Sequence, residues 1–488
     1  MALTLGRPEL LRTQAFIDGL WLDGGSDGLS EVRNPADGTL VATVPCLGAD
    51  GARHAIAAAE RAFDSWRARP AAERSRLLRC WAMAVGDHRE DLATILTAEQ
   101  GKPLAEARGE IDYAAAFLDW FGDEARRVYG ETIPAPSAAQ RIIVQKQPVG
   151  VCAAITPWNF PAAMITRKVG PALAVGCTMV VKPAPATPLT ALALAFLAEC
   201  SGIPPGVINV VPGDAAAIGD EFLANPIVRK LSFTGSTAVG KHLLARAAHT
   251  VKKCSMELGG NAPFIVFDDA DIDAALRGLM AAKFRNAGQT CVSPNRVFVQ
   301  DSIYDAFARR VVERTRALKV GYGKDPASEI GPLIDQAAVI KLSGLVDEAV
   351  ASGAELMTGG AQHALGGNFY EPTVLSGIST SMRIANEEAF GPVIPLLPFR
   401  NETDVVRMAN GTNSGLAAYF YSRDYSRIVR VAEALETGMV GVNESAISTE
   451  VAPFGGIKES GLGREGSRHG TDDYLEMKYL LIGNIQAA

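Results

Sequence analysis

The chain has 488 residues, of which 48% are hydrophobic and 21% charged, and its formal net charge is −7. A chain of this length exceeds what one hydrophobic core usually supports, so we expect two or three domains. The acidic balance and the absence of Lys or Arg runs longer than two residues argue against a nucleic-acid-binding protein.

The sequence shows no signal for export or membrane insertion. The N-terminal residues contain no apolar core of signal-peptide length, and the apolar stretch 183–198 holds three prolines. That stretch is also shorter than the roughly 18 residues a membrane helix needs. We therefore expect a cytoplasmic protein with no membrane partner.

The seven cysteines and six histidines are dispersed, with no CxxC, HxH or HxxxH pair. The sequence thus predicts neither a disulfide framework nor a metal site. Six cysteines lie in apolar or helical surroundings and are expected to be buried, unreactive thiols: Cys46, Cys80, Cys152, Cys177, Cys200 and Cys254.

The first 130 residues are mostly helical in pattern. Apolar residues recur at three- and four-residue spacing over 52–68 and 72–101, with charges on the opposite face. Residues 140–146 instead alternate polar and branched side chains. This alternation predicts an exposed strand that projects from the body of the protein.

From residue 149 onward, short apolar runs alternate with helical segments. The expected strands lie at 149–155, 177–182, 206–211 and 229–234, and the expected helices at 164–175, 187–200, 214–224 and 237–248. A second series follows, with strands at 262–267, 296–300, 417–421 and 439–442, helices at 272–284 and 303–318, and a final strand within 472–485. Such alternation is typical of βαβ units, so the predicted fold class is α/β with two doubly wound domains.

Three motif-like stretches fail on their context. Residues 235–242 resemble a phosphate-binding P-loop, but His242 stands where a Ser or Thr hydroxyl must hold Mg²⁺. The glycine pattern at 461–466 follows no strand and leaves too little chain for a dinucleotide-binding unit. The acidic run 268–273 lacks the glycine and the final glutamate of a calcium loop, so we expect it to cap the next helix.

Polar junctions follow several of the expected strands. Asn159 lies between aromatic residues and prolines, where its side-chain amide would be held rigidly. Lys182 ends the next strand, and residues 233–237 form a strand-to-helix turn whose amides could face a phosphate.

Glu257 and Cys291 are the two residues whose chemistry the residue pattern leaves open. Glu257 precedes two glycines in an apolar run, where burial should raise its pKa toward the range of a general base. The alternative is a buried carboxylate paired with Lys252 or Lys253. Cys291, between a glycine-containing turn and a proline, is either a reactive thiol on a loop or a small hydrophobic residue.

Taken together, these segments resemble the aldehyde dehydrogenase superfamily. The resemblance is carried by Ser-Met-Glu-Leu-Gly-Gly-Asn at 255–261, Gly-Gln-Thr-Cys at 288–291, and the junctions at 155–161, 182–188, 233–237 and 386–393. These six motifs come in the expected order, and the similarity runs from about residue 14 to the C-terminus.

The resemblance implies a mechanism. Cys291 would attack an aldehyde as a thiolate, giving a thiohemiacetal whose oxyanion the Asn159 amide and the Cys291 backbone N–H stabilise. Hydride transfer to a nicotinamide cofactor would leave a thioester, and Glu257 would activate the water that hydrolyses it. Glu388 would hold the nicotinamide ribose, with Phe390 beside the ring. The cofactor-binding residues that it implies are Thr156, Pro157, Trp158, Lys182, Ala184, Pro185, Gly213, Thr234, Gly235, Ser236, Leu258, Glu388 and Phe390.

The resemblance also bears on the choice between NADP and NAD. Lys182 would bind the adenosine ribose or its phosphate. Pro185 stands where NAD-preferring members often carry a glutamate that repels a 2′-phosphate. We therefore expect NADP to be preferred and NAD to be tolerated, with no metal required.

Within the family, the resemblance is greatest to succinate-semialdehyde dehydrogenases, and it is carried by residues 164–178, 283–291 and 450–467. By that resemblance, Arg167, Arg285 and Ser448 would grip the distal carboxylate of the substrate. The guanidinium fork suits a carboxylate. The alternative is that either arginine pairs only with a local acid.

Two departures keep other substrates open. Ser293 replaces the second cysteine that some members use as a redox switch, so that switch is absent, and Pro294 replaces a frequent alanine. Glutarate semialdehyde, another longer or aryl-bearing semialdehyde, or a general aldehyde therefore remain alternatives. Glu257 disfavours an acylating, coenzyme A-dependent dehydrogenase, and the presence of both Cys291 and Glu257 disfavours a non-catalytic relative.

The implied architecture has three parts. Residues 1–131 and 149–258 would form the dinucleotide-binding domain, 259–455 the catalytic domain, and 132–148 with 456–488 a bridging oligomerisation arm. Arm strands in this family extend a neighbour's sheet, so we expect a homodimer or homotetramer. The exposed strand at 140–146 supports this, because an uncovered edge strand is otherwise a liability.

Overall fold

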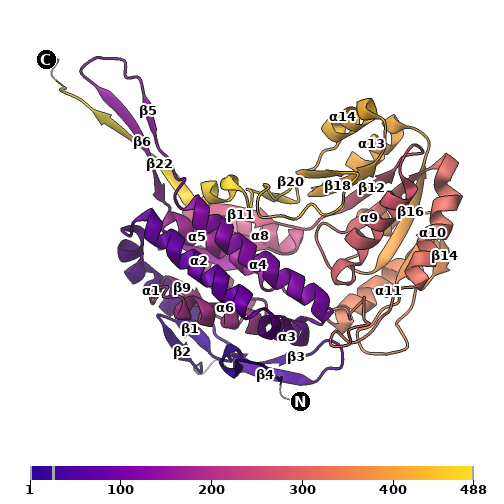
Figure 1. Cartoon of the computed structure of the whole chain (residues 1–488), viewed down its shortest axis with the longest axis horizontal. Coiled ribbons are helices and arrows are strands. Elements are labelled where there is room, and N and C mark those ends of the chain that lie inside the picture. Colours follow the sequence, from indigo (N-terminus) through magenta and orange to yellow (C-terminus); the bar gives the residue numbers. More distant parts are fainter. Residues whose placement is uncertain (1–2, 25–27, 486–488) are drawn as a thin grey trace.

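Two α/β lobes and a projecting arm make up the computed structural model, which describes residues 3–24 and 28–485 (Figure 1). The first lobe contains an eight-stranded sheet in the order β2–β1–β9–β8–β7–β10–β11–β21. Its strands are β1 (Ala15–Ile17), β2 (Leu20–Leu22), β7 (Val151–Ile155), β8 (Thr178–Lys182), β9 (Ile208–Val210), β10 (Val228–Thr234), β11 (Lys253–Glu257) and β21 (Gly461–Leu462). The strands from β9 to β11 are parallel, as the βαβ alternation predicts.

Helices cover both faces of this sheet. Cys152 and Ala154 of β7 belong to one apolar core, and Val151 and Ala153 belong to another. Because both faces are buried, the sequence of each of these strands is a continuous run of apolar residues. The first core is completed mainly by α2 (Ala71–Asp87), α3 (Arg89–Gln100), α4 (Leu104–Glu124), α5 (Ala163–Val175) and α6 (Leu189–Cys200), and the second by α1 (Ala49–Arg67), α7 (Ala215–Ala224) and α8 (Thr237–Ala247).

The second lobe repeats the same plan with its own core. Its seven-stranded sheet has the order β14–β15–β16–β13–β12–β18–β19. The strands are β12 (Ala262–Val266), β13 (Pro294–Gln300), β14 (Glu355–Thr358), β15 (Thr373–Ser376), β16 (Val393–Phe399), β18 (Ala417–Tyr421) and β19 (Met439–Val442). The helices are α9 (Ile272–Phe284), α10 (Tyr304–Arg316), α11 (Gln336–Ala351), α12 (Arg383–Asn386), α13 (Glu402–Asn410) and α14 (Tyr425–Ala434). The α/β fold class is therefore confirmed.

The arm is a three-stranded antiparallel sheet in the order β22–β6–β5. β6 (Arg141–Pro148) is the strand expected at 140–146, β22 (Leu475–Ile482) is the one expected near the C-terminus, and β5 is Glu131–Ile133. We expected the arm to include everything from residue 456, and two pairings correct this. β20 (Ile457–Lys458) pairs with β17 (Ser414–Gly415), and β21 covers the edge of β11, so the chain crosses both lobes before it enters the arm.

The remaining elements are short. β3 (Leu29–Arg33) pairs with β4 (Leu40–Pro45) beside the first lobe. The 3₁₀ helices are η1 (Pro8–Leu10), η2 (Ala248–Thr250), η4 (Asp301–Ile303) and η5 (Arg468–Tyr474), and η3 (Arg285–Gly288) is a turn in which Asn286 and Ala287 are left-handed.

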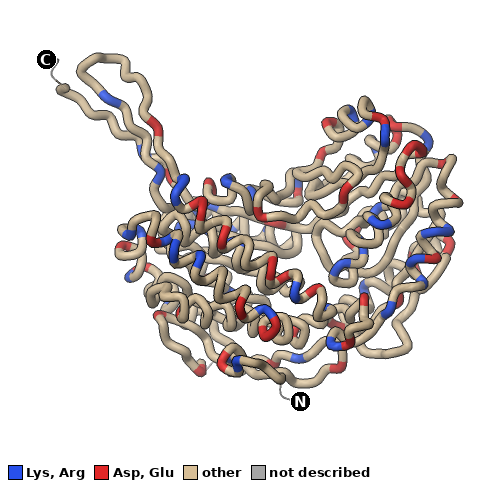
Figure 2. Tube along the Cα trace, in the orientation of Figure 1, with Lys and Arg blue, Asp and Glu red and all other residues tan. Residues whose placement is uncertain are grey.

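Basic and acidic residues are interspersed over both lobes (Figure 2). Within residues 3–24 and 28–485, no helix combines the length and apolar character needed to cross a membrane.

The expected burial of six cysteines holds only in part. Cys152 and Cys177 are buried, whereas Cys46, Cys80 and Cys254 are partly exposed. The expectation is wrong for Cys200, which is exposed. It is the last residue of α6, where the helix leaves the core.

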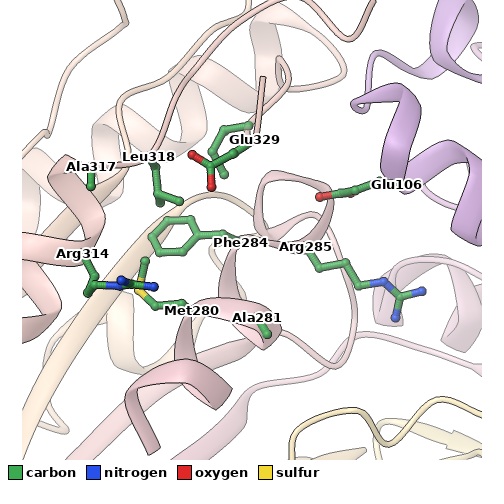
Figure 3. A pocket seen from close by; sticks show the side chains of 10 residues that line it. Glu106, Met280, Ala281, Phe284, Arg285, Arg314, Ala317, Leu318 and Glu329 are labelled. Carbon is green, nitrogen blue, oxygen red and sulfur yellow. The ribbon is translucent and has the colours of Figure 1, made fainter. Parts of the chain in front are cut away.

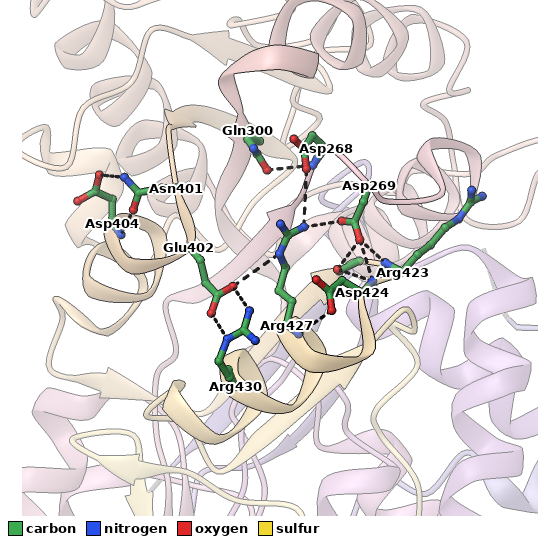
Figure 4. A network of polar contacts seen from close by, with 11 residues as sticks. Asp268, Asp269, Gln300, Asn401, Glu402, Asp404, Arg423, Asp424, Arg427 and Arg430 are labelled. Carbon is green, nitrogen blue, oxygen red and sulfur yellow. Dashed lines mark hydrogen bonds and ion pairs between the residues drawn. The ribbon is translucent and has the colours of Figure 1, made fainter.

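The acidic run 268–273 caps a helix and anchors an ion-pair network (Figure 4). Asp271 accepts a hydrogen bond from the Ala274 amide at the start of α9, as expected. Arg427 on α14 donates to Asp269 at 2.7 Å and lies 3.6 Å from Glu402 on α13. Burial opposes the charge of Asp269, but hydrogen bonds from Ser422 and two backbone amides lower its pKa.

Replacing Arg427 by methionine should lower the thermal midpoint, because two partly buried carboxylates lose their shared cation. The expected loss is about 1–3 kcal/mol, and each kcal/mol corresponds to roughly 2–4 °C in a lobe of this size. Arg407→Met is the matched control, since Arg407 lies 3.5 Å from Asp404 and its side chain is 74% exposed. Equal Tm values for Arg427→Met and Arg407→Met would contradict the assigned role of the network.

Candidate active site

A cavity of about 280 Å³ lies where the two lobes meet. Its lining brings together most of the residues that the sequence predicted: Pro157, Trp158, Asn159, Thr234, Gly235, Ser236, Glu257, Leu258, Cys291, Glu388 and Phe390. Ala338 and Lys341, both on α11, line it as well and were not predicted. They come from an ordinary amphipathic helix, which carries no sequence signal of a site.

The first lobe contributes the carboxyl ends of adjacent parallel strands. The register pairs Thr234 of β10 with Glu257 of β11, and Ile155 of β7 with Phe233 of β10. Because parallel neighbours end at the same sheet edge, the residues that follow β7, β10 and β11 converge there.

The second lobe delivers Cys291 on a strained turn. Asn286 and Ala287 have φ values of 51° and 54°, and Gly288 has 76°. Non-glycine residues rarely adopt this left-handed conformation, so hydrogen bonds must hold it in place. The Asn286 amide donates to the carbonyl oxygens of Asn159 and Gln289, and the Gln289 amide donates back to the Asn286 carbonyl.

Asn159 is fixed from behind by a buried ion pair. Lys102 donates to the Asn159 carbonyl at 2.7 Å and to Glu110 at 2.6 Å. Glu110 in turn accepts hydrogen bonds from the Ala162 and Ala163 amides near the start of α5. Both charged groups are buried, so each depends on the other. The sequence did not point to this pair, because the Asn159 carbonyl and the Ala162 amide that it holds lie 57 and 52 residues away along the chain.

The Asn159 side chain faces the turn that carries Cys291. Its amide nitrogen donates to the Gln289 carbonyl at 3.1 Å. That nitrogen has two hydrogens and so retains one donor for a further acceptor.

Cys291 is held as a thiol by its surroundings. Burial raises its pKa to about 12, and the carboxylates of Glu388 and Glu257 act in the same direction. The Arg167 guanidinium opposes them and lowers the pKa. Since the thiolate is the nucleophile, the positive charge of Arg167 favours the reactive form.

Glu257 is a buried carboxyl group that forms no direct ion pair among the described residues. Neither of its oxygens has a hydrogen-bond partner within the described residues, and the residue is 4% exposed. Burial and the neighbouring Glu465 carboxylate raise its pKa well above the usual value. The alternative pairing is wrong, because Lys252 donates to the backbone carbonyls of Asn225 and Val228 and Lys253 pairs with Glu476.

Behind Glu257 lies a buried group of charges that the sequence did not predict. Lys168 donates to Glu465 and, at 2.7 Å, to the Thr234 hydroxyl. Arg167 Nε lies 2.8 Å from the Oε2 atom of Glu465. Arg167, Lys168 and Glu465 are all nearly inaccessible to solvent.

The three predicted substrate residues have different surroundings. Arg167 does pair with a local acid, Glu465, yet its Nη2 atom has no partner in the described structure. Arg285 lies over the Phe160 ring, 4.7 Å from its centroid. Ser448 is half-buried in the loop between β19 and β20, and among the described residues no hydrogen bond joins it to either arginine.

Arg285 points toward the first lobe. A separate cavity of about 500 Å³ lies on the far side of Phe284, lined by residues such as Met280 and Leu318. Figure 3 shows Arg285 leaving that wall and extending toward α4, which carries Glu106. The Arg285 guanidinium therefore lies on the same side of the molecule as α4 and α5.

The residues expected to bind a cofactor fit a nicotinamide dinucleotide. Trp158 and Phe390 meet edge to face at 5.6 Å beside Cys291, and Glu388 accepts a hydrogen bond from the Gly260 amide. Burial raises the pKa of Glu388 to about 7. Ser236 caps α8, whose N-terminus opens at the same cavity.

Four residues expected to bind the cofactor lie outside this cavity lining: Lys182, Ala184, Pro185 and Gly213. Lys182 ends β8, donates to the Pro183 carbonyl at 3.1 Å, and has a pKa lowered to about 8 by burial. Ala184 is buried and Pro185 is exposed beside it. At Gly213 a side chain would meet the Leu47 backbone, so this glycine is also required by the fold. Thr156, the remaining predicted residue, is buried and directly follows β7.

The chain belongs to the aldehyde dehydrogenase family, whose model matches residues 21–480. It is 56% identical to an NADP(+) succinate-semialdehyde dehydrogenase, GabD, of Escherichia coli, over 98% of this chain and 99% of that protein. It is 55% identical to a glutarate-semialdehyde dehydrogenase of Pseudomonas aeruginosa, over 98% and 99%. A crystal structure of succinate-semialdehyde dehydrogenase from Burkholderia pseudomallei is 58% identical with a TM-score of 0.98, covering 98% of this chain and 100% of that one.

Replacing Arg167 by methionine should slow the alkylation of Cys291 by iodoacetamide at pH 8. The guanidinium lowers the pKa of Cys291, so its removal leaves less thiolate, and we expect a rate about 3- to 10-fold lower. Peptide mapping by mass spectrometry gives the rate for each cysteine. The exposed Cys200 should react at the same rate in both proteins, and an unchanged Cys291 rate would contradict the electrostatic role of Arg167.

Proposed function

We propose that this protein oxidises succinate semialdehyde to succinate, using NADP in preference to NAD. The observation that supports it most directly is the combination of Cys291 and Glu257 in one cavity with Arg167, which acts on both groups and keeps an unpartnered Nη2 atom. The relatives from Escherichia coli and Burkholderia pseudomallei are succinate-semialdehyde dehydrogenases, which agrees with a semialdehyde substrate. Glutarate semialdehyde, an aryl-bearing semialdehyde and a general aldehyde are less favoured alternatives.

Cys291 and Asn159 would carry out the first half of the reaction. The Cys291 thiolate attacks the aldehyde carbon, and the carbonyl oxygen of the resulting thiohemiacetal takes the negative charge. The free hydrogen of the Asn159 amide and the Cys291 backbone N–H stabilise that oxyanion. A bound nicotinamide supplies the two-electron acceptor, held by Glu388 and Phe390. Loss of hydride from the carbon leaves a thioester on Cys291.

Glu257 would carry out the second half. As a carboxylate it takes a proton from water, and the water oxygen attacks the thioester carbon. The C–S bond then breaks, which releases the acid and returns the Cys291 thiolate. The raised pKa makes Glu257 a stronger base, and its unbonded oxygens leave room for the water.

NADP preference rests on what surrounds the end of β8. Pro185 carries no charge that would repel a 2′-phosphate, and Lys182 stands three residues before it, at the end of β8. Burial lowers the pKa of Lys182 to about 8, so its ammonium group loses its proton more easily than that of an exposed lysine. Its attraction for a phosphate should therefore weaken above pH 8.

The arm supports assembly into a homodimer or homotetramer. Met477, Tyr479 and Leu481 of β22 are 74%, 59% and 50% exposed. These apolar side chains lie on a strand at the edge of a three-stranded sheet, a surface that another copy of the chain could cover.

Glu257→Gln should form the thioester but fail to hydrolyse it. Mixing the variant with aldehyde and NADP should give a burst of about one NADPH per active site, followed by turnover reduced about 10²- to 10⁴-fold. In the wild-type protein, the hydrolysis rate should fall as the pH decreases through the raised pKa of Glu257, because the protonated acid cannot accept a proton. Full turnover by the variant would exclude Glu257 as the base.

The substrate assignment is tested by kcat/KM for succinate semialdehyde, glutarate semialdehyde and butanal, with each cofactor. Charge-assisted hydrogen bonds contribute roughly 1.5–3 kcal/mol each, so two arginines should favour the acid over butanal about 10²- to 10⁴-fold. Arg285→Met should remove most of that preference while leaving butanal oxidation within about threefold. Equal rates for the three aldehydes in the wild-type protein would identify a general aldehyde dehydrogenase.

A further inference from the structure

We propose that the Tyr113 hydroxyl on α4 is a third donor to the distal carboxylate of the substrate, beside Arg167 and Arg285. This inference rests on the proposed function and adds a residue that the motifs did not point to. It is carried by three observations: an unpaired buried hydroxyl, its place within electrostatic reach of the Arg167 and Arg285 guanidinium groups, and its aromatic support.

The hydroxyl of Tyr113 is buried and has no hydrogen-bond partner within the described residues. A buried polar group without a partner costs about 1–3 kcal/mol, so such groups usually serve a ligand or a bound water. The Nη2 atom of Arg167 is buried and unpartnered as well. The chain therefore keeps two unused donors in this region.

Both arginines act on the Tyr113 hydroxyl from different lobes. Arg167, on α5, and Arg285, on η3, each favour its ionised form, while Glu465 and Glu450 disfavour it. Burial is the largest effect, and it raises the pKa of Tyr113. The phenol therefore remains protonated at neutral pH and is able to donate a hydrogen bond to an anion.

The Tyr113 ring is held in place by aromatic packing. It meets Phe117 edge to face at 4.9 Å, and Arg167 lies 5.4 Å above the Phe117 ring. Arg167 also lies 4.0 Å from the centroid of Phe454 and 2.8 Å from Glu465, so its side chain has little freedom. The hydroxyl and the guanidinium are thus presented by side chains that both pack on Phe117.

The directions of the side chains agree with a shared carboxylate. Arg285 extends toward α4 in Figure 3, and its charge acts on Glu106 of that helix as well as on Tyr113. A carboxylate has about four acceptor sites, so it can receive hydrogen bonds from two arginines and one phenol together.

The test is Tyr113→Phe, which removes one oxygen and keeps the ring. We expect kcat/KM for succinate semialdehyde to fall about 10- to 100-fold, while kcat/KM for butanal stays within about twofold. Tyr129→Phe is the matched control, because Tyr129 is 69% exposed and should change neither value. Equal losses for both aldehydes, or no loss for the acid, would overturn the inference.

A second readout separates this inference from the proposed function. Succinate should inhibit butanal oxidation competitively in the wild-type protein, and its Ki should rise about 10-fold or more in Tyr113→Phe. If wild-type protein shows no preference for succinate semialdehyde over butanal, the proposed function fails. Independently of that result, an unchanged Ki for succinate in Tyr113→Phe would refute the role of Tyr113 as a carboxylate donor.

Discussion

The buried ion-pair group of Arg167, Lys168 and Glu465 is the constraint on which both ends of the candidate site depend. Removing charges from water is costly, and a group that loses its partner in the interior is destabilised by about 3–5 kcal/mol. Here one carboxylate serves two cations, so the group carries a net positive charge. Arg167 lowers the pKa of Cys291, and Arg167 and Lys168 both lower the pKa of Glu257, so these cations favour the anionic forms of the two groups.

Glu465 also acts on Glu257. Its carboxylate raises the pKa of Glu257, whereas Arg167 and Lys168 lower it. A substrate carboxylate bound at Arg167 would add a further negative charge on the same side. Binding of the acid should then strengthen Glu257 as a base, which links recognition of the distal group to hydrolysis of the thioester.

The sequence predicted the parts of this structure that depend on local pattern. The βαβ alternation indicated the two sheets, and the polar junctions at the ends of β7, β10 and β11 indicated Asn159, Thr234 and Glu257, because strand ends can be recognised from the residues that follow them. The family resemblance then connected Glu257 to Cys291. What local pattern could not show was which buried charges meet across the fold.

Partners that are distant along the chain explain what was missed. Lys168 and Glu465 are 297 residues apart, and Asn286 is 127 residues from the Asn159 carbonyl that it holds. In the sequence, Tyr113 is an ordinary aromatic residue on an amphipathic helix. Only the structure distinguishes it, by its unpaired hydroxyl. The prediction that Cys200 is buried was wrong for a related reason. The apolar sequence of α6 does not indicate at which residue the helix leaves the core.

The connection between the lobes shows why the site requires glycine where the chain passes from one sheet to the other. A side chain at Gly260 would lie 2.2 Å from the Cys291 carbonyl oxygen, and one at Gly259 would lie 3.0 Å from the Glu388 carboxylate. The backbone can therefore pass between Cys291 and Glu388 only without side chains at these two positions. Arg167 and Tyr113 belong to one lobe and Arg285 to the other, so the same crossing that brings Cys291 and Glu257 to one cavity also brings together the three residues proposed to bind the carboxylate.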